Sequence, residues 1–106
     1  MVKSIDINYD VSGAKIFIPF KATCSLTSEE FSGDVIIEYH PTKMVLEYID
    51  IELFIGKITK NKLLTEDLAK LVFDEVSKSI KPKYLKVLVD VKHSEAHKPV
   101  QVWIEK

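Results

Sequence analysis

The segment from Thr65 to Ile80 constrains the fold more than any other part of the chain. Glu66 and Asp67 stand in its first turn, where carboxylates stabilise a helix, and Pro82 ends the pattern. Its apolar residues recur at helical spacing, and they are Leu68, Leu71, Val72, Val76 and Ile80. This pattern predicts an amphipathic helix, which must bury its apolar side against another layer of structure.

Strand-like segments follow and precede this helix. Downstream, Tyr84 to Val91 and Val100 to Ile104 are predicted strands, separated by a polar loop from Lys92 to Pro99. Upstream, Asp34 to His40 and Lys43 to Glu47 are expected to pair as a hairpin through Pro41 and Thr42.

The remaining elements are less regular. Ala14 to Phe20 and Ala22 to Leu26 are expected to be extended around Pro19, and Ile49 to Ile58 is expected to form a short helix. The order of strands, two helices and strands predicts an α+β fold, an antiparallel sheet with both helices on one face. The length of 106 residues predicts a single domain covering residues 1–106.

Composition excludes several classes of protein. The chain is 46% hydrophobic and 29% charged, which is typical of a packed domain and not of a disordered one. Its single cysteine excludes an intrachain disulfide, so nothing indicates an oxidising compartment. No segment approaches the ~20 apolar residues that a membrane span needs. We therefore expect a cytoplasmic protein with no membrane partner.

Charge gives no general attraction to nucleic acid. The formal net charge is −1, and all 15 basic residues are lysine. The chain therefore lacks the guanidinium forks that bind guanine or phosphate in a bidentate way. Any contact with nucleic acid has to be local.

Cys24 is the first candidate for chemistry. It lies near three carboxylates, Glu29, Glu30 and Asp34, in a stretch rich in hydroxyl groups. A lone cysteine is also often a small buried apolar residue, so composition leaves both interpretations open.

Four stretches of this sequence together resemble a known family. They are Lys21–Thr27 (KATCSLT), Glu47, Leu64–Asp67 (LTED) and Pro82–Val87 (PKYLKV), and Tyr39 and Pro41 match a further Tyr-x-Pro pattern. In this register the chain resembles the QueF nitrile reductases of queuosine biosynthesis, and especially the shorter archaeal QueF-like archaeosine synthases. The resemblance covers the chain from near Phe20 to Val91. It implies a tunnelling fold that forms rings, here a homo-oligomer that is a pentamer or a face-to-face pair of pentamers.

The resemblance also implies a role for Cys24. In this family a cysteine thiolate adds to the nitrile of 7-cyano-7-deazaguanine and gives a covalent thioimide, which requires an acid to protonate the nitrile nitrogen. The family acid is an aspartate directly before a phenylalanine. Here Glu30 precedes Phe31 and Asp34 follows it, so Glu30 is the first candidate and Asp34 the second. Both could instead be solvated loop carboxylates.

Two further carboxylates are expected to bind the base. Glu66 could accept two parallel hydrogen bonds from a guanine-like edge, although a glutamate at a helix start is stabilised without any ligand. Glu47 matches the acidic residue that begins the reductases' cofactor motif and is expected to face the base, or else to be a strand-end carboxylate. Thr65 occupies the position of a reductase histidine and is expected to be an N-cap.

The cofactor motif itself departs from the reductases. The reductases' motif resembles Glu-Ser-Lys-Ser-Leu-Lys-x-Tyr, whereas Glu47–Phe54 of this chain reads EYIDIELF. Both lysines of the motif are therefore lost, and Asp50 and Glu52 would repel a dinucleotide phosphate. The family's Asn-Pro-Arg-Gly-Gly segment is absent as well. We therefore expect no cofactor and no NADPH. Ammonia would then release the thioimide as a formamidine, which is the archaeosine product. The alternatives are an NADPH-dependent nitrile reductase and a non-catalytic RNA-binding or scaffold subunit.

The implied substrate is a nitrile base already in the D-arm of tRNA, so lysines would have to contact RNA. Two groups are expected in loops: Lys57, Lys60 and Lys62 between the helices, and Lys92 and Lys98 with His93 and His97 between the last strands. Either group could neutralise phosphates, and a solvated polar rim explains each group equally well. The third histidine, His40, is isolated, so too few ligands are available for a catalytic metal and none is expected.

Overall fold

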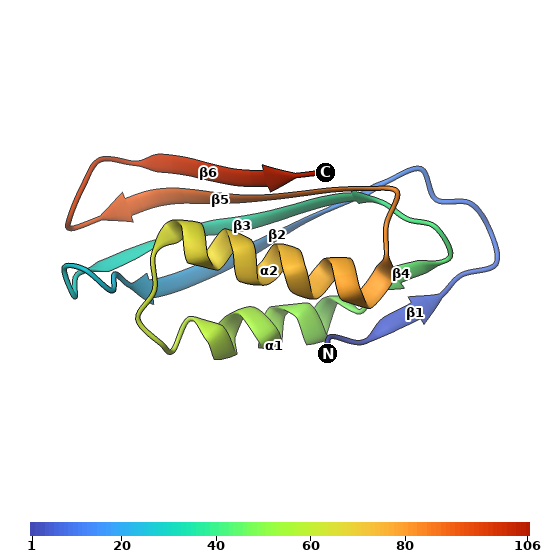
Figure 1. The fold of residues 1–106 in the computed structure, drawn as a ribbon, viewed down its shortest axis with the longest axis horizontal. Helices are drawn as coiled ribbons and strands as arrows, with labels where there is room; N and C mark the ends of the chain where they lie inside the picture. The colour runs from blue at the N-terminus through green and yellow to red at the C-terminus, as the bar shows by residue number, and fades with distance from the viewer.

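A computed structural model describes residues 1–106. Two helices, α1 (Tyr48–Ile58) and α2 (Thr65–Ile80), cover one face of an antiparallel sheet (Figure 1). The strand order of the sheet is β2-β3-β5-β6. Its strands are β2 (Ala14–Thr23), β3 (Glu30–His40), β5 (Tyr84–Ser94) and β6 (Val100–Glu105). The predicted α+β layer arrangement is confirmed.

The core lies between the helices and the sheet. It consists of one cluster of 22 buried residues. From β5 it takes Leu85, Val87, Val89 and Val91, whose side chains alternate towards the helices as the period of a strand requires. From α2 it takes residues spaced three and four apart, among them Leu68, Val72 and Val76, all fully buried. No helix of the structure is long and apolar enough to cross a membrane.

The ends of α2 follow from local chemistry. At the C-terminus Lys81 adopts a left-handed conformation with φ of 44°, and Pro82 follows it. At the N-terminus the expected cap is wrong: Thr65 is the first helical residue and is buried, and Leu64 is the cap. The Asp67 carboxylate accepts a hydrogen bond from the Leu64 amide at 2.9 Å, which satisfies an amide that the helix leaves free.

The predicted hairpin of residues 34–40 and 43–47 is also wrong. β3 pairs with β2 along one edge and with β5 along the other, so it has no edge left for the following strand. That strand, β4 (Met44–Leu46), pairs instead with β1 (Ser4–Asp6) in a separate two-stranded ladder. The actual hairpin is formed by β2 and β3, and residues 24–29 connect them.

β5 is longer than predicted, because it continues to Ser94. Lys92 and His93 therefore belong to a strand and not to a loop. Lys92 is an extra residue in the β3–β5 ladder, since Ser32 pairs with His93 and Gly33 with Val91. A Cβ atom on Gly33 would lie 1.8 Å from the carbonyl oxygen of Asp90, so this close approach of two backbones requires glycine.

The uncovered face of the sheet is organised in rows across all four strands. An apolar row consists of Phe17, Ile36, Leu88 and Trp103, each paired with the next. The neighbouring row alternates in charge: Lys15, Glu38, Lys86 and Glu105.

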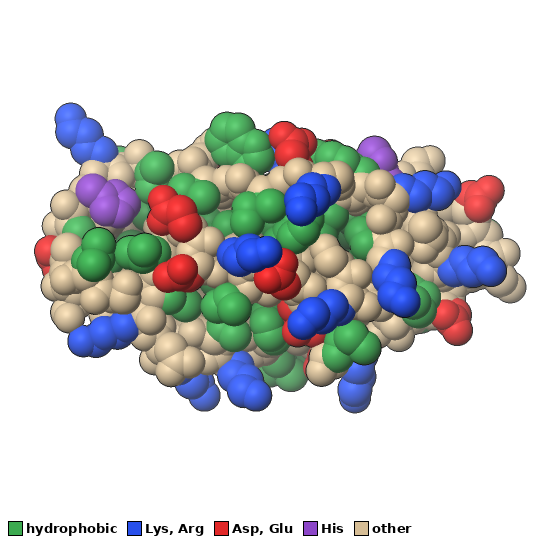
Figure 2. Space-filling model, viewed as in Figure 1, with side chains coloured by type: hydrophobic (Ala, Val, Ile, Leu, Met, Phe, Trp, Pro, Cys, Tyr) green, Lys and Arg blue, Asp and Glu red, His purple; other side chains and the backbone are tan.

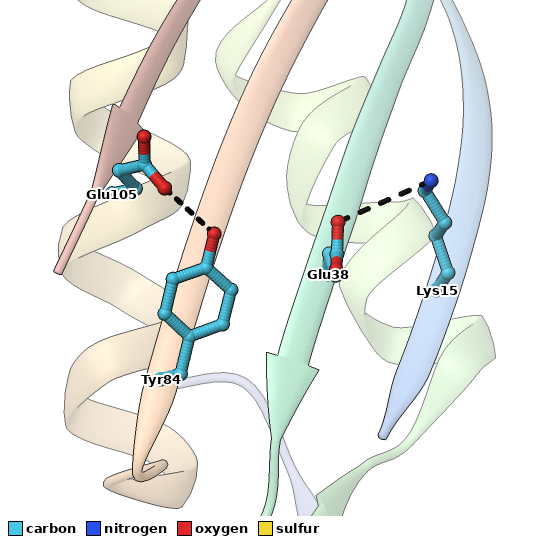
Figure 3. A network of polar contacts seen from close by, with 4 residues as sticks. All are labelled: Lys15, Glu38, Tyr84 and Glu105. Carbon is cyan, nitrogen blue, oxygen red and sulfur yellow. Dashed lines mark hydrogen bonds and ion pairs between the residues drawn. The ribbon is translucent and has the colours of Figure 1, made fainter.

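Figure 3 shows polar contacts made by Lys15, Glu38 and Glu105 of that charged row and by Tyr84. The Lys15 ammonium lies 4.0 Å from the Glu38 carboxylate, and the Tyr84 hydroxyl donates to Glu105 at 2.8 Å. The hydrogen bond to Glu105 raises the pKa of Tyr84 to about 12. Both rows end at the two outer strands, β2 and β6, whose outer edges are unpaired.

Candidate active site

Cys24 directly follows β2 and begins the turn that leads to β3. The turn is closed by the Ser28 amide, which donates to the Cys24 carbonyl oxygen at 2.9 Å, and Ser28 is left-handed with φ of 60°. Leu63 fixes the turn from outside: its amide donates to Thr23 at 3.0 Å, and its carbonyl accepts from Ser25 at 3.3 Å. Cys24 is therefore attached to the segment that opens α2. The expectation that the chain stays extended to Leu26 is wrong, because β2 ends at Thr23.

The turn favours the ionised form of the thiol. The backbone amides of Thr27 and Leu26 and the Thr27 hydroxyl donate towards the sulfur, and together they lower the pKa of Cys24 below its ordinary value. Partial burial and the charge of Glu29 act in the opposite direction. Cys24 is half-buried and packs against the core, so it is neither fully exposed nor sealed from solvent. The thiolate that these donors stabilise is the form in which a cysteine can act as a nucleophile.

Glu30 and Asp34 do not lie beside Cys24 within the chain. Glu30 forms an ion pair with Lys21 at 3.3 Å, and Asp34 forms one with Lys92 at 2.7 Å. In β3 they alternate with the buried residues Phe31 and Val35, so they point to the uncovered face of the sheet, away from the helices. Cys24 continues the alternation of Phe20 and Ala22, which point to the helices.

The carboxylate that does neighbour Cys24 is Glu29. The Cys24 amide donates to the Glu29 carbonyl oxygen at 2.9 Å, and Glu29 is half-buried. Glu29 precedes the residue that the family pattern points to. The length of the turn alone determines whether Glu29 or Glu30 lies next to the thiol. The sequence did not predict that length, because the segment was expected to be extended.

Glu66 lies at the same end of the molecule as Cys24. It is exposed in the first turn of α2, three residues beyond Leu63, and it makes no hydrogen bond or ion pair. Its neighbour Asp67 is the residue that binds the Leu64 amide. The Glu66 carboxylate is therefore available to a ligand.

Glu47 lies elsewhere. It is the N-cap of α1, and its side chain accepts a hydrogen bond from the Asp50 amide. The eleven residues of α1 span about 16 Å, and Cys24 is attached beyond their far end. Glu47 and Cys24 therefore do not meet within one chain.

The five lysines expected to contact RNA are dispersed. Lys62 donates to the Ser28 hydroxyl at 3.0 Å and so touches the Cys24 turn. Lys57 lies in the last turn of α1 and not in a loop, and Lys60 follows that helix. Figure 2 shows lysines spread along the helix-covered face and not gathered at one end.

Of the second lysine group, Lys92, His93 and His97 line a groove on the other side of the sheet, and Lys98 does not. Lys92 lines it and remains paired with Asp34, whose hydrogen bond raises the pKa of Lys92. Lys98 lies in the short loop after β5, and its carbonyl oxygen contacts the His97 ring at 2.7 Å. The groove has a volume of about 410 Å³ and mixes cations with Glu30 and Glu95, so it is not strongly basic.

The histidines are separate from the thiol. His40 packs against the Tyr84 ring with centroids 4.9 Å apart, and His93 and His97 line the groove. No three side chains among His, Cys, Asp and Glu are placed to hold a metal ion.

Comparison with known proteins places this arrangement in context. No family model matches the chain. The NADPH-dependent 7-cyano-7-deazaguanine reductase of Sulfurimonas denitrificans is 26% identical over 77 residues, which cover 72% of this chain. The match covers only 62% of the reductase's length. The crystal structure of an apo archaeosine synthase QueF-Like superimposes with a TM-score of 0.83 at 23% identity, covering 92% of this chain and 95% of that one. The expected resemblance is thus confirmed: the chain has the α+β tunnelling fold of the QueF-like archaeosine synthase.

Proposed function

We propose that this chain converts 7-cyano-7-deazaguanine in the D-arm of tRNA to archaeosine by adding ammonia to the nitrile. The observation that carries the proposal is the turn around Cys24, whose amides and hydroxyl lower the pKa of the thiol. The fold supports it, because the QueF-Like archaeosine synthase shares this fold.

The reaction has two steps. In the first, the Cys24 sulfur bonds to the nitrile carbon, one π pair of the triple bond moves to nitrogen, and a proton follows, which gives a thioimide. In the second, ammonia bonds to the same carbon, the carbon–sulfur bond breaks, and the thiol is restored. The product is a formamidine, and no electron is transferred to or from the substrate.

Recognition of the base is assigned to Glu66 and Glu47. Glu66 has a free carboxylate that can accept both hydrogens of a guanine-like edge. Glu47 lies about a helix length from Cys24 in one chain, so it would reach the base only across a junction between subunits. In the assembly that we propose, Cys24 comes from one subunit and Glu66 from its neighbour.

The proposed assembly is a ring, either a pentamer or two pentamers face to face. β6 can add antiparallel to the free edge of β2 in a second copy. We propose the register that continues the apolar and charged rows of the sheet from one copy to the next. Trp103 then stands next to Phe17 of the second copy, and Glu105 next to Lys15 of the second copy. Exposure supports it, because Phe17 is 60% and Trp103 52% exposed, and pairing would cover both.

The proposal includes no cofactor. Glu52 is exposed on α1, and Asp50 is half-buried in the first turn of that helix, where its carboxylate accepts a hydrogen bond from the Lys3 amide at 2.7 Å. Both carboxylates lie in the segment that matches the reductases' cofactor motif, where they would repel a dinucleotide phosphate. The alternative function, NADPH-dependent reduction of the nitrile, is favoured by the similarity to the Sulfurimonas reductase. A scaffold role would require an inert Cys24 thiol.

One experiment separates these functions. The protein is incubated with tRNA that carries the nitrile base, with ammonium or with NADPH, and the digested nucleosides are analysed by mass spectrometry. We expect formamidine with ammonium and no NADPH oxidation. Aminomethyl product with stoichiometric NADPH consumption would establish the reductase, and neither product would leave the scaffold.

We assign the contact with tRNA to five lysines: Lys57, Lys60, Lys62, Lys92 and Lys98. The proposed reaction takes place in the cytoplasm. Lys62 is the member that contacts the Cys24 turn, because its ammonium donates a hydrogen bond to the Ser28 hydroxyl. Lysines on both faces of the sheet would contact phosphates as point charges. Affinity for tRNA should therefore fall steeply with added salt.

A further inference from the structure

The turn between β2 and β3 puts a second ionisable side chain on the same face as the thiol. The ladder pairs Thr23 with Glu30, so the next opposed residues are Cys24 and Glu29, and a 2.9 Å hydrogen bond joins their backbones. Directly opposed residues in an antiparallel ladder point to the same face. The thiol and the Glu29 carboxylate therefore both lie on the helix-covered side.

We propose that Glu29 carries the proton of this reaction: its carboxylate takes the proton of the Cys24 thiol and delivers it to the nitrile nitrogen. This inference rests on the proposed function, since it concerns the step that forms the thioimide.

The surroundings of Glu29 suit that role. Its amide donates to the Thr27 hydroxyl at 3.2 Å, which holds its backbone in the turn, whereas its carboxylate makes no hydrogen bond or ion pair. The carboxylates of Glu30 and Asp34 are each occupied by a lysine on the opposite face. The charge of Glu29 also reaches the sulfur, because it raises the pKa of Cys24 against the effect of the amides.

The proton balance closes without another acid or base. The sulfur–hydrogen bond breaks and its proton moves to Glu29, the sulfur bonds to the nitrile carbon, and the nitrogen receives the proton from Glu29. When ammonia later adds, Glu29 accepts a proton from the new nitrogen and returns it to the departing sulfur. Glu29 begins and ends each step as a carboxylate.

The test measures two rates on each variant. One is the rate of adduct formation with free 7-cyano-7-deazaguanine, followed by intact-mass spectrometry, and the other is alkylation of Cys24 by iodoacetamide at neutral pH. Glu29→Gln should slow adduct formation about 100-fold, a typical contribution of a positioned acid or base. It should make alkylation faster, because removal of a neighbouring negative charge favours the thiolate. Glu52→Gln, which removes an exposed carboxylate on α1, should change neither rate.

The outcomes are distinct. Unchanged adduct formation in Glu29→Gln, or a loss matched by slower alkylation, overturns the role of Glu29. A loss confined to Glu30→Gln assigns the proton to the other face and also overturns it. Absence of any adduct on the wild-type protein, both with the free base and with tRNA that carries the nitrile base, contradicts the proposed function itself when alkylation is normal.

Discussion

The amide of Cys24 donates a hydrogen bond to the carbonyl oxygen of Glu29 across 2.9 Å. This bond closes the β2–β3 ladder one pair beyond Thr23 and Glu30, and it determines which carboxylate shares a face with the thiol. The length of one turn therefore decides the assignment of the proton carrier.

Replacement of Thr27 should raise the pKa of the thiol. Thr27→Val removes the hydroxyl that donates towards the sulfur, and loss of a donor to the thiolate makes the thiol harder to ionise. The midpoint of the pH profile of iodoacetamide alkylation should therefore move to higher pH. Ser25→Ala is the matched control in the same turn and should leave the midpoint in place. A midpoint that stays or moves to lower pH in Thr27→Val would contradict the hydrogen bond.

Two glycines should respond in opposite ways to alanine. Gly33→Ala places a Cβ atom 1.8 Å from the Asp90 carbonyl oxygen, so the β3–β5 ladder must shift. The free energy of unfolding should therefore fall by about 1–3 kcal/mol. Gly56 lies in α1 with open space around it, so Gly56→Ala should stabilise the fold by roughly 0.5–1 kcal/mol. Urea denaturation of both variants measures the difference. Equal stabilities would show that the bulge does not require glycine.

The elements of the fold that could be predicted from the sequence are those whose pattern lies within a short stretch of the chain. The periodicity of Leu68, Val72 and Val76 predicted α2, and the alternation of β5 predicted a strand, since each pattern repeats over neighbouring residues. The pairing of β4 with β1 could not be predicted, because a strand's partner depends on which edges are already occupied.

The same distinction holds at the site. The roles of Cys24 and Glu66 follow from their match to the family's motifs and stay predictions. Which of Glu29 and Glu30 lies on the same face as Cys24 could not be predicted, because it depends on the turn between β2 and β3. That turn contains Ser28 in a left-handed conformation, which its side chain does not favour.

Charge reversal should test the register proposed for the ring. Lys15→Glu would place a carboxylate beside Glu105 of the neighbouring copy and weaken the assembly, and Glu105→Lys alone should do the same. The double variant restores opposite charges across the junction and should recover the oligomer. Size-exclusion chromatography with light scattering measures this at several concentrations. A double variant that dissociates as far as the two single variants would rule out this register.

The central claim is a covalent bond between Cys24 and the nitrile carbon, and intact-mass spectrometry of the protein mixed with 7-cyano-7-deazaguanine tests it most directly. We expect the mass of the wild-type chain to increase by that of one base, with the added mass mapped to Cys24 after digestion. Cys24→Ala should remain unmodified and keep its fold, since loss of one half-buried thiol removes little core volume. An unmodified wild-type chain, or an equal adduct on Cys24→Ala, would contradict the mechanism.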